Sequence, residues 1–405
     1  GGGVFRSVDG GDTWMPVNTG LPNDKLFVYD LEINPQSPNI VYATLHGKPP
    51  GGVWQSSNYG NSWTQIYAGA LDGRALLVDP FDSNLLYYGA ATYEGFYRAI
   101  GGQFTKTGGN WIVNIGSVSA DPYHPGRVFT GICVKIDDAR CAKSLARSTN
   151  SGQNWTVYDA GVVTNEIAFA PDASTAYLSY NNDDGVYKST DGGVSWTRSS
   201  TGLSGYSVTG VAIDPNNSNT IVAALYDSGV KISRDAGVTW SDISPVVSDA
   251  RITNLTGLAM LRGNGNVIFI ITASGSIYYT KDQGGRWFDV YNGYPAALAP
   301  QAFASQNDSP YANRPIPDPD ADVRVAEAGI AEELIQPAAA ATPNLVASSP
   351  FTGEILVGTT GRGLLRLNAS MDKWLSTGLS TGSVFALAFD YATPGRILAG
   401  MDAAS

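Results

Sequence analysis

Residues 185–203 read GVYKSTDGGVSWTRSSTGL, and residues 3–21 read GVFRSVDGGDTWMPVNTGL. Each phrase places a short run with β-branched and aromatic residues before a Ser-x-Asp triplet, two glycines and a tryptophan. Such a run favours a strand, and the glycines favour a tight hairpin turn because they adopt positive φ at no steric cost. The phrase therefore predicts two antiparallel strands joined by a short polar turn.

The same turn recurs along the chain, with Asp or Asn at its third position and Trp at its end. The six clear copies carry Asp9, Asn58, Asn150, Asp191, Asp235 and Asp282 at that third position. Two degenerate copies end at Trp111 (TKTGGNW) and Trp374 (NASMDKW). Up to Trp287 the repeated tryptophans stand roughly 41 to 49 residues apart. A repeat of this length, with four short strands in each unit, is typical of β-propeller blades.

Residues 210–243 show how one unit divides into strands. We expect GVAIDP to be the innermost strand A, TIVAAL strand B, GVKIS strand C and TWSDI strand D, with the Asp turn between C and D. In that turn the carboxylate can accept hydrogen bonds from backbone amides, and the Ser or Thr hydroxyl can bond to the same turn. We therefore interpret the repeated Asp and Asn residues as structural.

The two ends of the chain carry complementary halves of one unit. Residues 384–401 supply strands A and B, whereas residues 3–18 supply strands C and D. Joined in a two-plus-two latch, they make one blade. The expected fold over residues 1–405 is therefore a single closed all-β propeller of four-stranded blades. Eight blades are expected, or seven if the weak third or last unit is not a blade.

Composition and charge narrow the classes of partner. The 405 residues carry a net charge of −11, which argues against a nucleic-acid partner because phosphate binding needs clustered Lys and Arg. No apolar run approaches the roughly 20 residues that span a bilayer. His46 and His124 stand alone in the sequence, so we expect no metal ion and no cofactor.

The chain has two cysteines, Cys133 and Cys141, eight residues apart in a polar segment. They could close a small loop as a disulfide, which implies an oxidising compartment. Two unpaired thiols are the alternative. A disulfide would agree with a secreted or cell-surface protein.

The repeated turn resembles the Asp-box, S-x-D-x-G-x-T-W, also called the bacterial neuraminidase repeat. The resemblance covers nearly the whole chain and implies propeller blades rather than one activity. Proteins with this repeat include sialidases, xyloglucan-cleaving enzymes built of two propellers, sortilin-type receptors and a photosystem II assembly factor. The phrasing of residues 214–240 is most similar to the xyloglucanase and sortilin-like group of secreted repeat proteins.

The resemblance implies a secreted or cell-surface module that binds a glycan or a protein. One alternative is a polysaccharide-cleaving glycoside hydrolase, and another is an assembly factor of the photosystem type. Among glycoside hydrolases, a sialidase is less expected than a xyloglucanase, because the Arg-Ile-Pro motif of sialidases is absent from the sequence. The xyloglucanase site lies between two propellers, whereas this chain predicts one.

Three segments depart from the repeat: residues 46–52, residues 131–145 and the acidic, Pro- and Ala-rich insertion 297–342. In a four-stranded meander, the B–C loops and D-to-A connections lie on the face opposite the A–B and C–D turns. Function concentrates on loops that leave a regular scaffold, so we expect a glycan or protein ligand on that face. The predicted contacts are Tyr93, Lys135, Arg140, Tyr180, Tyr226 and Arg362.

Three carboxylates, Asp30, Glu32 and Glu166, occupy strand A positions where the other units have mostly small residues. Paired carboxylates beside a cleft could act as general acid and base in glycoside hydrolysis. The alternative is that they are hydrogen-bonded or solvated in a central channel.

Overall fold

The structure is a computed structural model in which only strands, turns and irregular segments are described. The described residues are 2–22, 26–46, 51–69, 73–90, 95–109, 112–135, 141–158, 164–170, 172, 174–180, 185–203, 207–247, 250–261, 264–273, 276–289, 343–348, 354–359, 363–368 and 374–402. The insertion 297–342 lies outside them, so its role stays a prediction. Within the described part, no helix is long and apolar enough to cross a membrane.

The described strands form eight four-stranded antiparallel sheets and one two-stranded hairpin. In seven of the sheets the strands follow one another in chain order, which is the meander expected of a propeller blade. The all-β propeller fold predicted from the repeat is thereby confirmed. The chain divides into two compact units, Gly1–Val163 with Arg324–Ser405, and Thr164–Val323.

The first unit contains five of the sheets, four of which are continuous in the chain. Their strands are β3 (Phe27–Ile33), β4 (Val41–His46), β5 (Gly52–Ser56) and β6 (Thr64–Tyr67); β7 (Gly73–Val78), β8 (Leu85–Ala90), β9 (Gly95–Ile100) and β10 (Gln103–Thr107); β11 (Ile112–Ala120), β12 (Val128–Lys135), β13 (Cys141–Ser148) and β14 (Thr156–Val157); β29 (Pro343–Ser348), β30 (Ile355–Thr359), β31 (Leu364–Leu367) and β32 (Trp374–Ser376).

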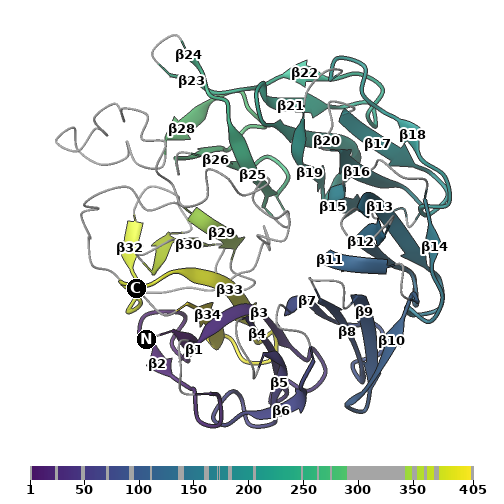
Figure 1. The fold of residues 1–405 in the computed structure, drawn as a ribbon. Helices are drawn as coiled ribbons and strands as arrows, with labels where there is room; N and C mark the ends of the chain where they lie inside the picture. The colour runs from purple at the N-terminus through teal and green to yellow at the C-terminus, as the bar shows by residue number, and fades with distance from the viewer. Residues whose placement is uncertain are drawn as a thin grey trace. The chain divides into compact units, whose positions relative to one another are not determined.

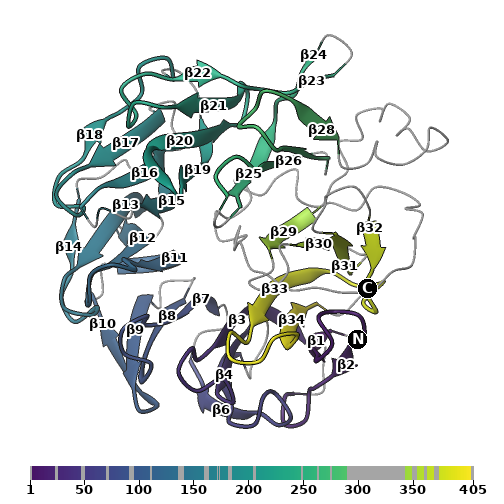
Figure 2. The same ribbon diagram turned by 180° about the vertical axis from the view of Figure 1, so that it is seen from behind.

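The fifth sheet of this unit joins the two ends of the chain, as predicted. It consists of β1 (Gly3–Ser7), β2 (Met15–Pro16), β33 (Val384–Phe389) and β34 (Ile397–Met401), and Figures 1 and 2 show β1 beside β34. Gly3 pairs with Met401 and Ser7 with Ile397. That the blades close into a ring, and how many blades the ring has, stay predictions.

The second unit contains three sheets and the hairpin. Their strands are β15 (Thr164–Phe169), β16 (Ala176–Tyr180), β17 (Gly185–Ser189) and β18 (Thr197–Arg198); β19 (Val208–Asp214), β20 (Asn217–Leu225), β21 (Gly229–Ser233) and β22 (Ser241–Asp242); β25 (Leu255–Met260), β26 (Ile268–Thr272), β27 (Ile277–Thr280) and β28 (Trp287–Asp289); and the hairpin β23 (Val246–Val247) with β24 (Ala250–Arg251). The strands expected within residues 210–243 are all present.

Apolar side chains at alternate positions make the core between neighbouring sheets. Val28 and Leu31 of β3 are buried with Ala386 of β33 and Leu398 of β34 in one cluster. Val222 of β20 belongs to a comparable cluster in the second unit. Within each unit, the core therefore lies between the faces of neighbouring sheets.

One predicted turn is wrong. The degenerate copy ending at Trp111 was expected to join strands C and D, but β9 turns into β10 through Gly101 and Gly102, at φ of 55° and 81°. Two residues at positive φ make a tight hairpin turn, which two glycines form without strain. The TKTGGNW segment therefore begins on strand β10 and runs past the end of that strand.

A second prediction, that residues 131–145 form a loop, is also wrong. Strands β12 and β13 extend through most of this range, and only residues 136–140 lie between them. Both cysteines lie on strands, where Cys133 pairs with Lys143 and Cys141 with Lys135. The run from Val128 to Lys135 is rich in β-branched and other apolar residues, which favour a strand. The disulfide itself stays a prediction.

The innermost strands share an irregularity near their beginning. Register shifts occur between Val28 and Asp30, Gly73 and Ala75, Val208 and Gly210, Leu255 and Gly257, and Val384 and Ala386. A β-bulge increases local twist and re-aims the next side chain. The strand A position that holds Asp30, and small residues in most other units, thus directly follows a repeated bulge.

Candidate functional site

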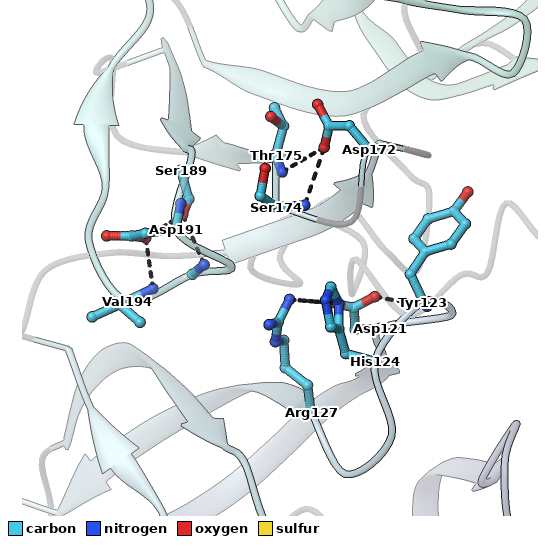
Figure 3. Close-up of polar contacts among 11 residues, drawn as sticks. Asp121, Tyr123, His124, Arg127, Asp172, Ser174, Thr175, Ser189, Asp191 and Val194 are labelled. Atoms are coloured by element: carbon cyan, nitrogen blue, oxygen red, sulfur yellow. Dashed lines mark hydrogen bonds and ion pairs between the residues drawn. The ribbon is translucent and has the colours of Figure 1, made fainter.

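The turn around Asp191 shows what the repeated box residues do. Asp191 Oδ1 accepts the N–H groups of Val194 and Ser195, both at 2.9 Å, and the Ser189 hydroxyl at 2.7 Å (Figure 3). Its Oδ2 accepts the Ser195 hydroxyl at 2.5 Å. The Ser189 hydroxyl in turn accepts the Gly193 N–H at 2.7 Å. All of these partners belong to the turn itself, so the carboxylate satisfies local donors.

The other five boxes repeat this arrangement, including the two with asparagine. Asn58 Oδ1 accepts the Ser62 N–H at 2.9 Å, and the Asn58 amide donates to the Ser62 hydroxyl at 2.9 Å. Asn150 Oδ1 accepts the Asn154 N–H at 2.9 Å. Because a neutral amide replaces the carboxylate, the turn needs an acceptor oxygen rather than a charge.

Hydrogen bonds hold the box carboxylates in the ionised form. The side-chain and backbone donors of Ser195 lower the pKa of Asp191 far below its usual range. The donors of Thr239 lower the pKa of Asp235 to about 2. A hydrogen bond from Thr280 likewise lowers the pKa of Asp282. Groups with such low pKa values do not exchange protons near neutral pH, which makes them unsuited to general acid–base catalysis.

In three of the boxes, the fourth residue links two blades through its backbone carbonyl. In Tyr59, Ser151 and Ala236 this residue has φ between 55° and 61°. Their carbonyls accept hydrogen bonds from Arg6 at 2.8 Å, Arg98 at 3.0 Å and Lys188 at 2.9 Å, respectively. Each cation lies on strand C of the preceding blade. These bridges were missed, although the Lys or Arg before the serine in GVYKS and GVFRS was a visible signal.

The end of the chain is linked to its beginning in the same way. Arg366 on β31 is completely buried, and its guanidinium donates to the Gly10 carbonyl at 3.3 Å and to Asp12 at 3.0 Å. The box tryptophans also join blades: Trp63 Nε1 donates to the Val17 carbonyl at 2.7 Å, and Trp240 Nε1 to the Ser199 carbonyl at 2.8 Å. In these cases the box connects a blade to its neighbour within the same unit.

Asp30, the first candidate catalytic carboxylate, is buried and bonded to the backbone. It is 3% exposed on β3, where Oδ1 accepts the Leu31 N–H at 2.8 Å and Oδ2 accepts the Leu76 N–H at 2.9 Å. Leu76 lies on β7, so this carboxylate ties two neighbouring sheets. A buried carboxylate with both oxygens bonded to backbone donors favours a structural role.

Glu32 and Glu166 lie in different units. Glu32 follows Asp30 on β3 by two residues and is partly exposed. Glu166 lies on β15 of the second unit, and its side chain is outside the description. Across the described residues, no group of three His, Cys, Asp or Glu side chains is placed to hold a metal ion.

Of the six predicted ligand contacts, Tyr226 is the one whose side chain is described. Its ring is 38% exposed after β20, its N–H donates to the Ser207 carbonyl at 2.9 Å, and its carbonyl accepts the Leu255 N–H at 3.2 Å. Lys135 and Tyr180 lie at the ends of β12 and β16. The remaining predicted contacts, Tyr93, Arg140 and Arg362, lie outside the described residues. Most of the expected ligand face therefore stays a prediction.

The A–B turns carry a second recurring carboxylate, which follows strand A. Asp121 Oδ1 accepts the Tyr123 N–H at 2.8 Å, and its Oδ2 contacts Arg127 at 2.6 Å and His124 at 3.0 Å (Figure 3). Asp79 and Asp390 occupy the same position after β7 and β33. The sequence signal was an Asp-Pro pair after strand A at Asp79 and Asp121, whereas Asp390 is followed by Tyr391.

Comparisons with known proteins give the same fold and a partial likeness in sequence. No family model matches the chain. A xyloglucanase of Paenibacillus sp is 26% identical over 245 residues, which is 50% of this chain and 23% of that protein. A xyloglucanase of Hypocrea jecorina (strain QM6a) is 24% identical over 259 residues, which is 52% of this chain and 30% of that protein. The chain thus matches less than a third of the length of these relatives.

Two solved structures resemble the chain over most of its length. Chaetomium thermophilum Sqt1 bound to the N-terminus of the ribosomal protein L10 has a TM-score of 0.60 at 12% identity, and the match covers 94% of this chain and 98% of that one. The GH74 xyloglucanase from Xanthomonas campestris has a TM-score of 0.50 at 16% identity, with 96% and 68% covered. The chain is therefore a β-propeller, similar over about half its length to xyloglucanases.

Proposed function

We propose that this chain is a secreted or cell-surface propeller that binds a xyloglucan-type polysaccharide without cleaving it. The observation that carries the proposal is the similarity over half of the chain to proteins named xyloglucanases. Binding rather than cleavage is supported by Asp30, which is 3% exposed with both carboxylate oxygens bonded to backbone amides. The proposed contacts include the exposed ring of Tyr226, because aromatic faces stack on sugar rings.

Hydrolysis is the second candidate, and the names of the same relatives favour it. In this case Glu32 or Glu166 is a candidate for one of the two carboxyl groups, general acid or general base, that glycoside hydrolysis requires. Glu32 is partly exposed on β3, in contrast to Asp30. The expected consequence is that Glu32→Gln or Glu166→Gln removes product release while polysaccharide binding remains.

Native electrophoresis through gels that contain xyloglucan, with a second gel that contains no polysaccharide, tests the proposal. The protein should be retarded in the first gel, and reducing ends should not accumulate in a parallel incubation. A matched control is Asp191→Asn, which preserves the turn; relative to its own migration in the gel without polysaccharide, it should be retarded as much as the wild type. Equal migration in both gels would contradict polysaccharide binding, and an accumulation of reducing ends would favour the hydrolase.

A further inference from the structure

Three exposed aromatic side chains occupy A–B turns of the first unit. Phe81 lies between β7 and β8, Tyr123 between β11 and β12, and Tyr391 between β33 and β34. Their exposed fractions are 42%, 41% and 52%. Each follows a buried aspartate by one or two residues. We call these three side chains the aromatic turn row.

Hydrogen bonds hold the backbone that presents each ring. Asp79 Oδ1 accepts the Phe81 N–H at 2.8 Å, and Asp121 Oδ1 accepts the Tyr123 N–H at 2.8 Å. In the third turn, Asp390 Oδ1 accepts the Ala392 N–H at 2.9 Å. Figure 3 shows the Tyr123 ring pointing away from Asp121 and its partners. Since the turns are fixed, ordering these rings on a ligand costs little backbone entropy.

Two turns of the row, those of Phe81 and Tyr123, lie on neighbouring sheets, and one sheet separates the turn of Tyr391 from that of Phe81. β33 packs beside β3, β3 beside β7, and β7 beside β11. The turn after β3 fills the place between Tyr391 and Phe81, and Asn34 Nδ2 in it donates to the Ser83 carbonyl of the next turn at 2.8 Å. Gln36 of this turn is exposed and accepts the Ser83 hydroxyl at 3.0 Å.

The chemistry around the rings suits a neutral sugar polymer. Uncharged polar groups lie in the turns of the row and in the turn after β3, among them Asn84, Thr393 and Gln36; the exposed carboxylate of Asp82 lies beside Phe81. The nearby arginines are paired, Arg127 with Asp121 and Arg396 with Asp390. Separate flat rings with hydrogen-bonding groups between them match pyranose units, which have apolar faces and hydroxyl edges. An amphipathic helix would instead need a continuous apolar groove.

We propose that the aromatic turn row of Phe81, Tyr123 and Tyr391 is a binding surface for a neutral polysaccharide chain. It lies on the side of the A–B and C–D turns, whereas Tyr226 and the other predicted contacts belong to B–C loops. This inference rests on the proposed polysaccharide binding and adds a second surface to it. A chain crossing the row would contact several sheets of the first unit in succession.

The test compares retardation in xyloglucan gels for the wild type, Phe81→Ala/Tyr123→Ala/Tyr391→Ala, and Tyr226→Ala. Each lost aromatic contact weakens binding by roughly two- to tenfold, so the triple variant should bind about tenfold or more weakly. Phe81→Tyr/Tyr123→Phe/Tyr391→Phe keeps the rings and should bind like the wild type. Circular dichroism and urea midpoints of all variants separate lost contacts from lost folding.

The outcomes distinguish the two proposals. A wild type that is not retarded contradicts polysaccharide binding and the row together. If the wild type and the triple-alanine variant are retarded equally, polysaccharide binding stands but the row is not the binding surface, because binding then occurs elsewhere. Loss of retardation in Tyr226→Ala, with the triple-alanine variant unchanged, assigns the ligand to the B–C loops and likewise overturns the row. If the ring-retaining variant is weakened as much as the triple-alanine variant, stacking is not the cause.

Discussion

Replacement of Asp30 by alanine tests whether this carboxylate has a structural or a catalytic role. The side chain is 3% exposed, and the Leu76 N–H of the neighbouring sheet donates to it at 2.9 Å. Its loss leaves two backbone donors without this acceptor. A buried donor deprived of its acceptor costs about 1–3 kcal/mol, so the loss of two such bonds in Asp30→Ala should lower the free energy of unfolding by about 2–6 kcal/mol. Asp30→Asn keeps one acceptor oxygen and should lose less.

Urea denaturation followed by tryptophan fluorescence measures the change, and hydrogen exchange locates it. The amide of Leu76 should exchange faster in Asp30→Ala than in the wild type, whereas the amides of the second unit should be unchanged. Polysaccharide binding should persist in the folded variant. Unchanged unfolding and unchanged exchange at Leu76, together with loss of a polysaccharide-cleaving activity, would refute the structural interpretation of this residue.

Three further predictions concern the repeated turns and the joined ends. Asp191→Ala should lower the urea midpoint more than Asp191→Asn does, because Asn58 already forms the same turn with an amide; equal midpoints of the two variants would contradict this. Acid should weaken the fold: the lowered pKa of each box carboxylate, about 2 in Asp235, makes its stabilisation complete above about pH 4 and lost as the pH falls through the folded value. A urea midpoint that stays flat from about pH 5 to pH 2 would count against it. Deletion of residues 384–405 removes the strand paired with β1 and should lower the melting temperature, so an unchanged melting curve would rule out the pairing.

The sequence was sufficient to predict the strands and turns of most blades because the box is a local device. The hydrogen bonds of the box join its Asp or Asn, its glycine and its hydroxyl residues, which are only a few residues apart. The order of these residues in the sequence therefore predicts the conformation of the turn. The sheet shared by the two ends was also predictable, since each end carried half of a repeat. The turn at Gly101 and Gly102 was missed because a weak copy of the box near Trp111 received more weight than a glycine pair.

Contacts between blades could not be predicted from the sequence. Asp30 accepts a hydrogen bond from the N–H of Leu76, which is 46 residues further along the chain. No local sequence pattern indicates that these two residues are in contact. The bulge before Asp30 likewise depends on packing near the innermost strands rather than on a residue signature. The Arg98 and Lys188 bridges were more accessible, because a cation repeats before the end of strand C, but their acceptors are backbone carbonyls of the next blade.

Incubation of the wild-type protein with xyloglucan, followed by calorimetry and by chromatography of the same mixture, tests the central proposal most directly. We predict saturable binding heat and an unchanged polymer profile, with no oligosaccharide released over the incubation. The appearance of oligosaccharides would show that the chain is a hydrolase. The absence of binding heat at every concentration tested would contradict polysaccharide recognition itself.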